Sequence, residues 1–555
     1  MSIPSDSASR RRWVYALLIV VALAGILGRI LSVANVVEPH LARSDPAQSA
    51  AAILLPLAAT TPVETAALLA AGETVWSEIG ADEPARLWPR TRPRPEPTLG
   101  GNDRSRWATI RALVDEGTYV IGWRVERSAD PKDYADYGIM TENGWQTLDK
   151  VLNPREHPLY EGEAYPRWKA FYSSKPPLLP TLLAGEYWLL RHGLGWSITD
   201  KDGRWLVVRT ILITINWLPM LVYLVLLSRL AERLGTTDWG RLYVIAAGAF
   251  ATYLTPFAIV LNNHTIAACT ALFALYPALK VWEPALARGS RLNFLVAGLF
   301  AGFTATCELP AAAFLAGLFL LLLARSPGRT LLFFVPAALL PIAGLLLTNY
   351  LAIGDIVPAY SKLDSPWYQH EGGYWRPDPT KRGIDWAWQK EGKAAYAFHL
   401  LLGHHGLFSL TPIWLLALVG IALVLLRQDE ESHAGFWTGR ILGRSPGRGA
   451  ELVVVSALTL FLTVVVLGFY LFVANRMSNN YGGMTSGPRW FVWLTPFWLL
   501  TLLPAADRLG ARRWGRVLGY ALLGLSVLSV SYPAWNPWRH PWLYNFFESQ
   551  GWVRY

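Results

Sequence analysis

The sequence is poor in charge and has almost no cysteine. Only 16% of its 555 residues are charged, whereas charged residues make up about a quarter of a typical globular chain. Cys269 and Cys307 are the only cysteines, and they offer neither a disulfide framework nor a metal-ligand spacing. No P-loop, dinucleotide fingerprint or zinc signature occurs, and no internal repeat is evident. An ordinary soluble domain is therefore excluded.

Long apolar runs take the place of the missing charge. Hydrophobic residues make up 53% of the chain, and runs of roughly 20 residues recur, the length that crosses about 30 Å of hydrocarbon. We therefore predict an all-α polytopic membrane protein with about eleven transmembrane helices, external juxtamembrane helices and loops. The net charge of +10 comes largely from arginines in short loops between spans. That pattern follows the positive-inside rule and does not indicate a nucleic-acid partner.

Basic residues fix the predicted topology. Arg10–Arg12 precede the apolar run Trp13–Val33, which is longer than the roughly 7–15-residue core of a signal peptide, so we interpret it as a retained span with a cytoplasmic N-terminus. Leu178–Leu190 is short and carries Glu186, and we place it at the membrane interface. Every short basic loop then shares the side of Arg10–Arg12. The predicted cytoplasmic loops are 229–241, 280–291, 325–329, 427–448 and 507–516.

Six parts are expected along the chain. They are a cytoplasmic N-terminus with the first span (1–33), an external segment with juxtamembrane helices (34–203), a transmembrane bundle (204–352), an external loop (353–405), a second transmembrane bundle (406–533) and an external C-terminal tail (534–555). The unusual polar residues then collect on the external face. The chain is predicted to lie in the cytoplasmic (inner) membrane with its active site facing the periplasm, that is, outside.

Asp103 lies at the start of a predicted amphipathic helix over Asp103–Glu116, which Gly117 ends. One interpretation is a helix N-cap, because aspartate is a preferred cap and suits the positive end of a helix. The other is a catalytic base that deprotonates an acceptor hydroxyl or amine. One residue could serve both roles.

Lys175 precedes Pro176 and Pro177, and proline is favoured in the first turn of a helix. The lysine therefore lies at the positive end of a helix dipole, which disfavours a cation. A bound phosphate would resolve the conflict, since helix N-termini and lysine both favour anions. The alternative is a solvated or snorkelling lysine. Arg489, in Gly487–Trp490, repeats the pattern as a second candidate phosphate ligand, with an interface anchor as its alternative.

Further candidates line the same face. Ionisable groups at the ends of spans are hypotheses of function by default, although each could simply be hydrated. The candidate site-lining residues are Arg106, His264, Glu308, His404 and Tyr481. The external loop Gly354–His405 is rich in tryptophan, tyrosine and acids, a composition that suits a sugar as well as an interfacial aromatic belt. Its members include Tyr360, Trp367, Tyr368, Tyr374, Trp375, Asp378, Asp385, Trp386 and Trp388.

Two stretches resemble a known family. DRSRWATIRALVDEGTYVIGW is similar to the first external loop of the C-type (GT-C) glycosyltransferase superfamily, as in protein O-mannosyltransferases and lipid A aminoarabinose transferases. SSKPPLLPTLLAGEYWLL resembles that family's K-P-P-L segment, and YGG…GPRWFVWLTP matches its later half. The resemblance implies sugar transfer from a polyprenyl-phosphate donor to a lipid, glycan or protein acceptor. It aligns Asp103 with the catalytic acid and Lys175 with the lysine that contacts phosphate.

The sequence departs from the family at three places. Arg104 replaces a glutamate, Asn263–His264 occupy a turn that often has an aspartate, and Glu308 stands near an expected lysine. These departures leave a divalent-metal requirement open, and no cofactor is assigned. Two other function classes stay open as well: a flippase or transporter for lipid-linked sugars, and a catalytically silent scaffold among membrane lipids. The absence of inverted repeats and the one-sided polar clustering favour the enzyme.

Overall fold

The computed structural model describes residues 6–36, 95–156, 165–282, 290–362, 364–426, 448–473 and 481–555. The chain divides into two compact units, Met1–Val33 with Leu99–Tyr555 and Ala34–Thr98. Of the second unit the structure describes residues 34–36 and 95–98, where Asn35 pairs with Glu96 in an antiparallel bridge. Residues 427–447 of the predicted loop 427–448, and residues 283–289 of the predicted loop 280–291, lie outside the described residues. Everything below concerns the first unit.

The first unit is mostly helical, and the chain is a polytopic membrane protein. Among the described residues, seven helical stretches are long and apolar enough to cross a membrane. They comprise α1 (Asp6–Ser32), α6 (Gly203–Leu212) with α7 (Leu218–Leu234), α10 (Asn263–Leu279), α13 (Pro327–Arg329) with α14 (Val335–Ile353), α19 (Arg448–Gly468), α20 (Thr495–Gly510) and α21 (Arg513–Ser531). Short π-helical or 3-10 turns extend several of them: Ile213–Trp217, Lys280–Trp282, Thr330–Phe334, Phe469–Val473 and Arg489–Leu494.

Seven is fewer than the predicted number of about eleven. Apolar runs also predict spans at 242–260, 293–306, 309–324 and 406–426. In the structure these overlap the helices α8 (Asp238–Phe250), α11 (Arg291–Cys307), α12 (Ala312–Arg325) and α17 (Trp414–Leu425). They have 12 to 17 residues and rise about 18–26 Å at about 1.5 Å per residue, short of the hydrocarbon thickness. The helix α5 (Leu178–Leu194), placed at the interface from the sequence, is not among the candidate spans.

An antiparallel sheet interrupts the helices, so the prediction of an all-α chain is wrong. Its four strands are β1 (Gly122–Glu126), β2 (Tyr134–Tyr137), β3 (Lys150–Leu152) and β4 (Arg167–Ser173), in the order β2-β1-β4-β3. The aromatic and β-branched alternation around Trp123–Val125 and Trp168–Tyr172 suits strands. These runs are short and carry charges, so their sequence does not stand out as strands. We therefore predicted juxtamembrane helices for this segment instead.

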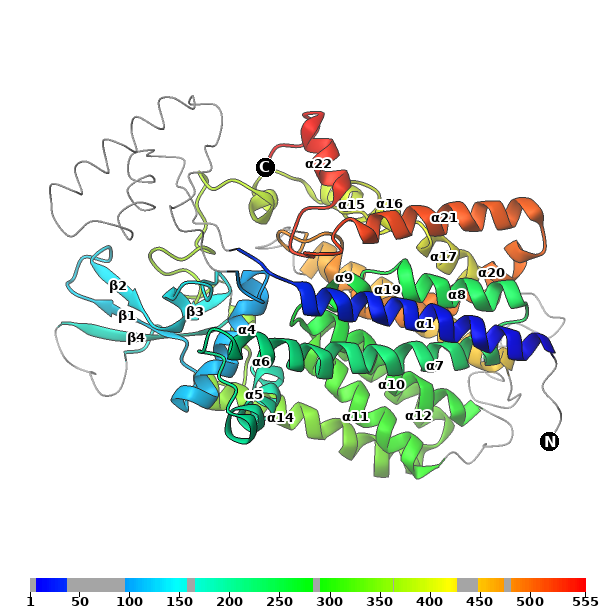
Figure 1. The fold of residues 1–555 in the computed structure, drawn as a ribbon, viewed down its shortest axis with the longest axis horizontal. Helices are drawn as coiled ribbons and strands as arrows, with labels where there is room; N and C mark the ends of the chain where they lie inside the picture. Colours follow the sequence, from blue (N-terminus) through cyan, green and yellow to red (C-terminus); the bar gives the residue numbers. More distant parts are fainter. Residues whose placement is uncertain are drawn as a thin grey trace. The chain divides into compact units, whose positions relative to one another are not determined.

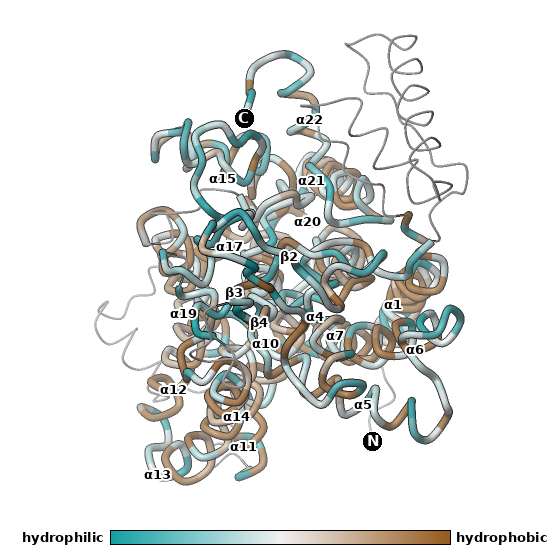
Figure 2. The backbone as a smooth tube through the Cα atoms, turned by 90° about the vertical axis from the view of Figure 1, so that its left-hand side faces the viewer, coloured by the Kyte–Doolittle hydropathy of each residue, from teal (hydrophilic) through white to brown (hydrophobic). Residues whose placement is uncertain are grey.

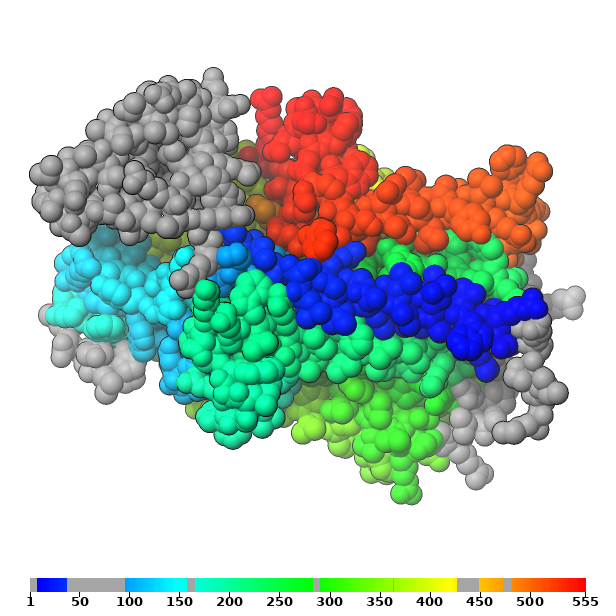
Figure 3. All heavy atoms as spheres, in the orientation of Figure 1, coloured from blue at the N-terminus to red at the C-terminus, as the bar shows by residue number. Residues whose placement is uncertain are grey.

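Small residues let the spans approach closely. A side chain on Gly298 or Gly302 of α11 would collide with the backbone of Phe334 or Ala338 at the start of α14. This four-residue spacing of glycines is typical of helix contacts in membranes, where packing replaces the hydrophobic effect. One side of α1 lies at the surface in the space-filling view (Figure 3). Trp13 of this helix is 76% exposed, which fits contact with lipid.

The sheet and the N-terminus lie at opposite ends of the helical bundle (Figure 1). At the N-terminal end Arg11 bonds to Glu232 and Asp238, and Asp507 accepts from the amide of Thr236. Two predicted cytoplasmic loops, 229–241 and 507–516, therefore share one end with Arg11, as the charge pattern predicts. Figure 2 looks onto the other end, where hydrophilic segments gather around the strands and apolar helices surround them.

The remaining helices of the described residues are short. They are α4 (Gly101–Arg111), α9 (Leu254–Phe257), α15 (Lys393–Leu401), α16 (Leu407–Leu410) and α22 (Trp542–Ser549), with one-turn or π-helical pieces at Ala112–Glu116, Ile139–Thr141, Leu309–Ala311, Ala359–Lys362 and Ile384–Gln389. Of these helices, α4 packs against strand β4. The predicted helix at Asp103–Glu116 is confirmed, since α4 and the following π-turn run from Gly101 to Glu116. Gly117, at φ +68°, ends it as predicted.

Candidate functional site

Asp103 is buried inside the start of α4. Gly100 is the N-cap residue, and Asp103 occupies the third helical position. The interpretation of Asp103 as the N-cap is therefore wrong, because the N-cap lies three residues before it. Its carboxylate accepts hydrogen bonds from the amides of Gly100 (2.6 Å) and Leu99 (3.0 Å). Burial raises the pKa of Asp103, although these backbone bonds oppose the shift. The carboxylate therefore fixes the first turn of α4.

Lys175 forms an ion pair with Asp149, a residue that the sequence analysis did not single out. The ammonium lies 2.7 Å from Asp149 Oδ1. The pair arises from sheet register: β3 begins at Lys150, which pairs with Ser173 at the end of β4, so the residue before β3 faces the residues after β4. Ser174 accordingly donates its amide to the Asp149 carbonyl (3.1 Å). The carboxylate of Asp149 therefore supplies the negative charge that Lys175 needs at the positive end of a helix. From the sequence we had inferred that a bound phosphate supplies it.

The pKa values of both partners depart from their ordinary values. Burial lowers the pKa of Lys175, while Asp149 opposes the shift. Burial also acts to raise the pKa of Asp149, but Lys175, Arg489 and Arg106 outweigh it, and the pKa of Asp149 lies below its ordinary value. Asp149 is therefore a carboxylate that stays ionised and a weak base at neutral pH.

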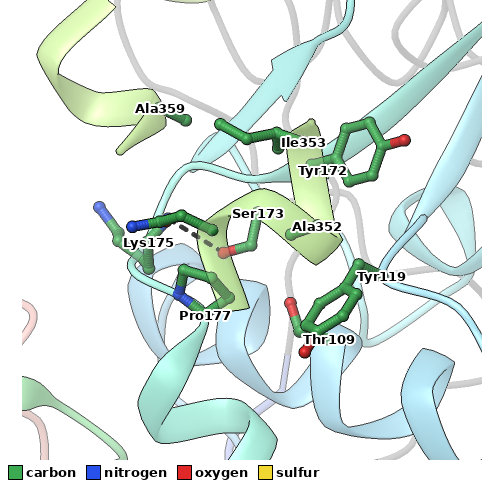
Figure 4. Close-up of a pocket in the computed structure, with 10 residues that line it drawn as sticks. Thr109, Tyr119, Tyr172, Ser173, Lys175, Pro177, Ala352, Ile353 and Ala359 are labelled. Atoms are coloured by element: carbon green, nitrogen blue, oxygen red, sulfur yellow. Dashed lines mark hydrogen bonds between the residues drawn. The ribbon is translucent and has the colours of Figure 1, made fainter. Parts of the chain in front are cut away.

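A pocket opens beside Lys175. It is narrow, with an interior of about 20 Å³, and its polar wall comes from α4, β4 and the turn to α5. Figure 4 shows Lys175 at one end of the pocket and Thr109 with Tyr119 at the other, with Ile353 of α14 along its edge. A polar wall facing the end of an apolar helix suits an amphiphile, whose head group and chain need different surroundings.

Arg489 lies close to these groups but lacks a matching partner. Its Nε is buried and has no hydrogen-bond partner among the residues that the structure describes. Its guanidinium lies 5.3 Å from the centre of the Trp538 ring. Gly482 permits this position, because a Cβ there would lie 2.9 Å from Arg489 Nε, and its φ of +93° favours glycine. A buried donor without an acceptor in the protein can form its hydrogen bond with a ligand instead.

Asp385 supplies the matching unpaired acceptor. Its Oδ2 accepts from Tyr374 (2.7 Å), whereas its Oδ1 is buried without a hydrogen-bond partner in the described part of the chain. A Cβ on Gly483, next to Gly482, would lie 2.8 Å from that oxygen, so Asp385 and Arg489 border the same two-glycine turn. Burial raises the pKa of Asp385, against the Tyr374 bond, and Arg489 and Lys175 act on it electrostatically. Asp385 is therefore a stronger base than an exposed aspartate.

The aromatic loop packs beside Asp385. Tyr374, Trp375 and Trp386 form one cluster with ring centres 5.0 to 6.4 Å apart. Trp375 also donates to the Leu148 carbonyl (3.2 Å), next to Asp149. The loop that we predicted to face a sugar thus touches the segment that carries the Lys175–Asp149 pair.

Arg106 joins the ends of α4 and α10. It donates to the side chains of Asn102 and Asn263 (2.5 Å each), and Asn263 donates to Glu308 (2.7 Å). Glu308 also contacts His264 Nδ1. Burial lowers the pKa of Arg106 to about 10, with Asp149 opposing that shift and Arg489 adding to it. The structure therefore brings Arg106, His264 and Glu308 into one network beside the Lys175 pair.

His404 and Tyr481 belong to a different cluster. Their rings pack against each other (4.9 Å) and beside His399 and Glu391, not against Lys175. Of the residues that sequence reasoning missed, Asp149 had no local signal, because only strand register pairs it with Lys175. Asp385 was named only as one acid of an aromatic loop.

Comparison with known proteins gives a similarity of fold only. No protein-family model and no curated protein sequence matches this chain. The structure is similar to crystal structures of an archaeal oligosaccharyltransferase from Archaeoglobus fulgidus, a GT-C membrane glycosyltransferase, in its apo form (TM-score 0.38, 12% identity) and tethered to an acceptor peptide (TM-score 0.39, 13% identity). Each match covers 82% of this chain and 54% of the other, so this chain spans about half the length of the protein it matches. We therefore infer function from the site.

Proposed function

We propose that the chain transfers a sugar from a polyprenyl-phosphate donor to a hydroxyl or amine acceptor at the outer face of the membrane. The observation that carries this proposal is the pairing of an unsatisfied cationic donor, Arg489 Nε, with an unsatisfied carboxylate oxygen, Asp385 Oδ1, beside one glycine turn. Left without a ligand, each buried polar atom costs about 1–3 kcal/mol. A phosphate and an acceptor proton would satisfy both.

The phosphate is assigned to Arg489, with Lys175 as the second cation. Arg489 has a hydrogen-bonding nitrogen free, whereas Lys175 holds Asp149 at 2.7 Å. Negative charge grows on the phosphate as it leaves the sugar, and fixed cations stabilise that charge more than they stabilise the bound donor. The pocket beside Lys175, with an interior of about 20 Å³, would have to widen to receive the head group while the prenyl chain follows the apolar helices.

Asp385 is assigned as the base. A base must have an oxygen within reach of the acceptor proton and a pKa high enough to take it. Asp385 has the free Oδ1 and a raised pKa. The resemblance instead points to Asp103, whose oxygens accept from two backbone amides, so that role would require α4 to release them. Asp385 and Asp103 are both predicted bases, and substituting each one separately tests which of them acts.

The proposed step is a single displacement. The acceptor oxygen or nitrogen attacks the anomeric carbon, its proton passes to Asp385, and the bond from that carbon to the phosphate oxygen breaks with its electron pair leaving on the phosphate. The configuration at the anomeric carbon inverts. Tyr374, Trp375 and Trp386 offer ring faces against which the sugar's C–H face would pack.

Purified protein in liposomes, supplied with radiolabelled polyprenyl-phosphate sugars and a lipid, glycan or peptide acceptor, tests the proposal. We expect transfer by the wild type and its loss in Arg489→Gln. Movement of the labelled donor across the bilayer without transfer would identify a flippase. Neither transfer nor movement with any donor of the panel would leave a scaffold and overturn the proposal.

A further inference from the structure

A second cluster of ionisable side chains lies apart from the Lys175 pair. Glu391 precedes α15, His399 lies in α15, and His404 with His405 follow it before α16. Figure 1 shows α15 and α16 in the part of the unit that also holds α22 and the last residues of the chain. Tyr555 joins the cluster from that last segment, and Tyr481 from the segment before Gly482. Three distant parts of the sequence therefore meet here.

The side chains of Glu391, His399 and His404 converge. One ligand atom of each lies within 4.8 Å of the others. His399 Nε2 lies 3.8 Å from Glu391 Oε1. Tyr555 Oη lies 2.5 Å from that carboxylate oxygen and 2.7 Å from His404 Nε2, so it occupies the space between them. Two imidazoles, a carboxylate and a phenol oxygen thus surround one point.

The geometry points to a binding site for a divalent transition-metal ion, Zn²⁺ above all, with Glu391, His399 and His404 as ligands and Tyr555 as the fourth. Two histidines and a glutamate are an established Zn²⁺ ligand set with one further position, at bond lengths near about 2.0–2.2 Å. Tetrahedral ligand atoms at those bond lengths stand about 3.3 Å apart. The ligand atoms, now up to 4.8 Å apart, therefore have to approach by about 1.5 Å at their widest, which rotation of the stacked His399 and His404 rings, 4.1 Å apart, would provide.

Hydrogen bonding alone does not account for this cluster. The His399 imidazole makes no hydrogen bond with any residue that the structure describes, and its Nδ1 is buried. Its Nε2, which faces Glu391 Oε1 at 3.8 Å, is therefore held by no hydrogen bond among the described residues and is left for a ligand. Gly403 permits the arrangement, because a side chain there would collide with the His399 ring. His405 contacts His404 Nδ1 (2.5 Å), the position from which an outer partner orients a metal-bound imidazole.

The ion would join the loop at 391–405 to Tyr555 and, through the bond from Tyr481 to Glu391, to the segment leading into Gly482. Its role is then structural, and it does not depend on sugar transfer.

Metal content tests the site. Protein with an affinity tag that lacks histidine is purified in detergent, dialysed against buffer with micromolar Zn²⁺, and analysed by inductively coupled plasma mass spectrometry. We expect about one Zn²⁺ per chain in the wild type and at least a tenfold loss in His399→Ala/His404→Ala. The matched control is His192→Ala, an exposed histidine of α5 whose ring contacts only local atoms, and it should keep the metal.

A second measurement guards against a variant that fails to fold. Glu391→Gln keeps the shape of the side chain, and Co²⁺ added to metal-free wild type should give the visible absorption of tetrahedral cobalt, at least several-fold weaker in Glu391→Gln. A chelator should lower the melting temperature of the wild type and leave that of Glu391→Gln unchanged. Wild type without metal, or equal metal in wild type and the double variant, would overturn the site.

Discussion

Two arginines at opposite ends of the bundle, Arg11 buried and Arg489 partly buried, differ in how their guanidinium groups are hydrogen-bonded. All three groups of Arg11 that can donate are used: Nε and Nη2 bond to Glu232 (2.9 and 3.0 Å) and Nη1 to Asp238 (2.6 Å). Arg489 instead has a buried Nε without a hydrogen-bond partner in the described residues. A fully paired buried charge stabilises the fold, whereas an unpaired one keeps its bonding capacity for a ligand. The contrast holds for these two side chains and not for the two ends as a whole, because Arg241 at the Arg11 end also has a buried Nε without a hydrogen-bond partner in the described residues.

The base should produce the largest loss. Asp385→Asn removes the free carboxylate, and we expect transfer to fall by about 10²–10⁴-fold while the melting temperature stays near that of the wild type. Asp103→Asn, which weakens two backbone bonds, is the matched variant. We expect it to lower the melting temperature. If Asp103→Asn abolishes transfer at unchanged stability while Asp385→Asn stays active, the base is Asp103, as the resemblance implies.

Removal of the unpaired cation comes next. Arg489→Gln should lower transfer by about 10²–10³-fold, the usual cost of one group that stabilises developing charge. Stability should change little, because Arg489 makes no ion pair with a described residue. Initial rates and thermal unfolding in one detergent measure both. A large loss of stability with full activity per folded molecule would make Arg489 structural, like Arg11.

The pH profile sharpens the assignment of the base. Burial raises the folded-state pKa of Asp385, so its basic form is lost as the pH falls through a value above the ordinary aspartate range of about 4. We expect the acid limb of the transfer rate to lie above that range and to disappear in Asp385→Asn. A base at Asp149, whose pKa is lowered, would instead place the limb below it.

Arg11→Gln should give the smallest change in activity. It breaks three charge-assisted bonds at the far end of the bundle and should destabilise the fold by roughly 1.5–3 kcal/mol. Transfer per folded molecule should change less than twofold. Chemical or thermal unfolding, together with the assay on the folded fraction, measures both. A variant of wild-type stability would show that exposure of Asp238 lets water replace the pair.

Local pattern predicted the features that depend on near neighbours. The helix at Asp103–Glu116 and its end at Gly117 follow from periodicity and from the conformational freedom of glycine within one turn. Span positions likewise follow from runs of apolar residues. Lys175 at the start of α5 was correctly placed, because Pro176 and Pro177 mark the beginning of a helix.

The pairing of charges could not be predicted in that way. Asp149 meets Lys175 only because β3 pairs with β4 in the register Lys150 to Ser173, and a sequence does not disclose the register of short strands. Asp385 and Arg489 meet across about a hundred residues at a two-glycine turn. Glu391, His404 and Tyr555 likewise meet only in three dimensions.

The sequence by itself determined a membrane protein whose polar residues collect at one face, because hydrophobic length and loop charge act locally. Tertiary structure alone decided which charge is free. It gave Lys175 an internal partner and left Arg489 Nε without one among the described residues. Arg489 is therefore the first candidate for binding phosphate, whereas the sequence favoured Lys175. Whether a buried charge is satisfied depends on every side chain around it, and those come from distant parts of the chain.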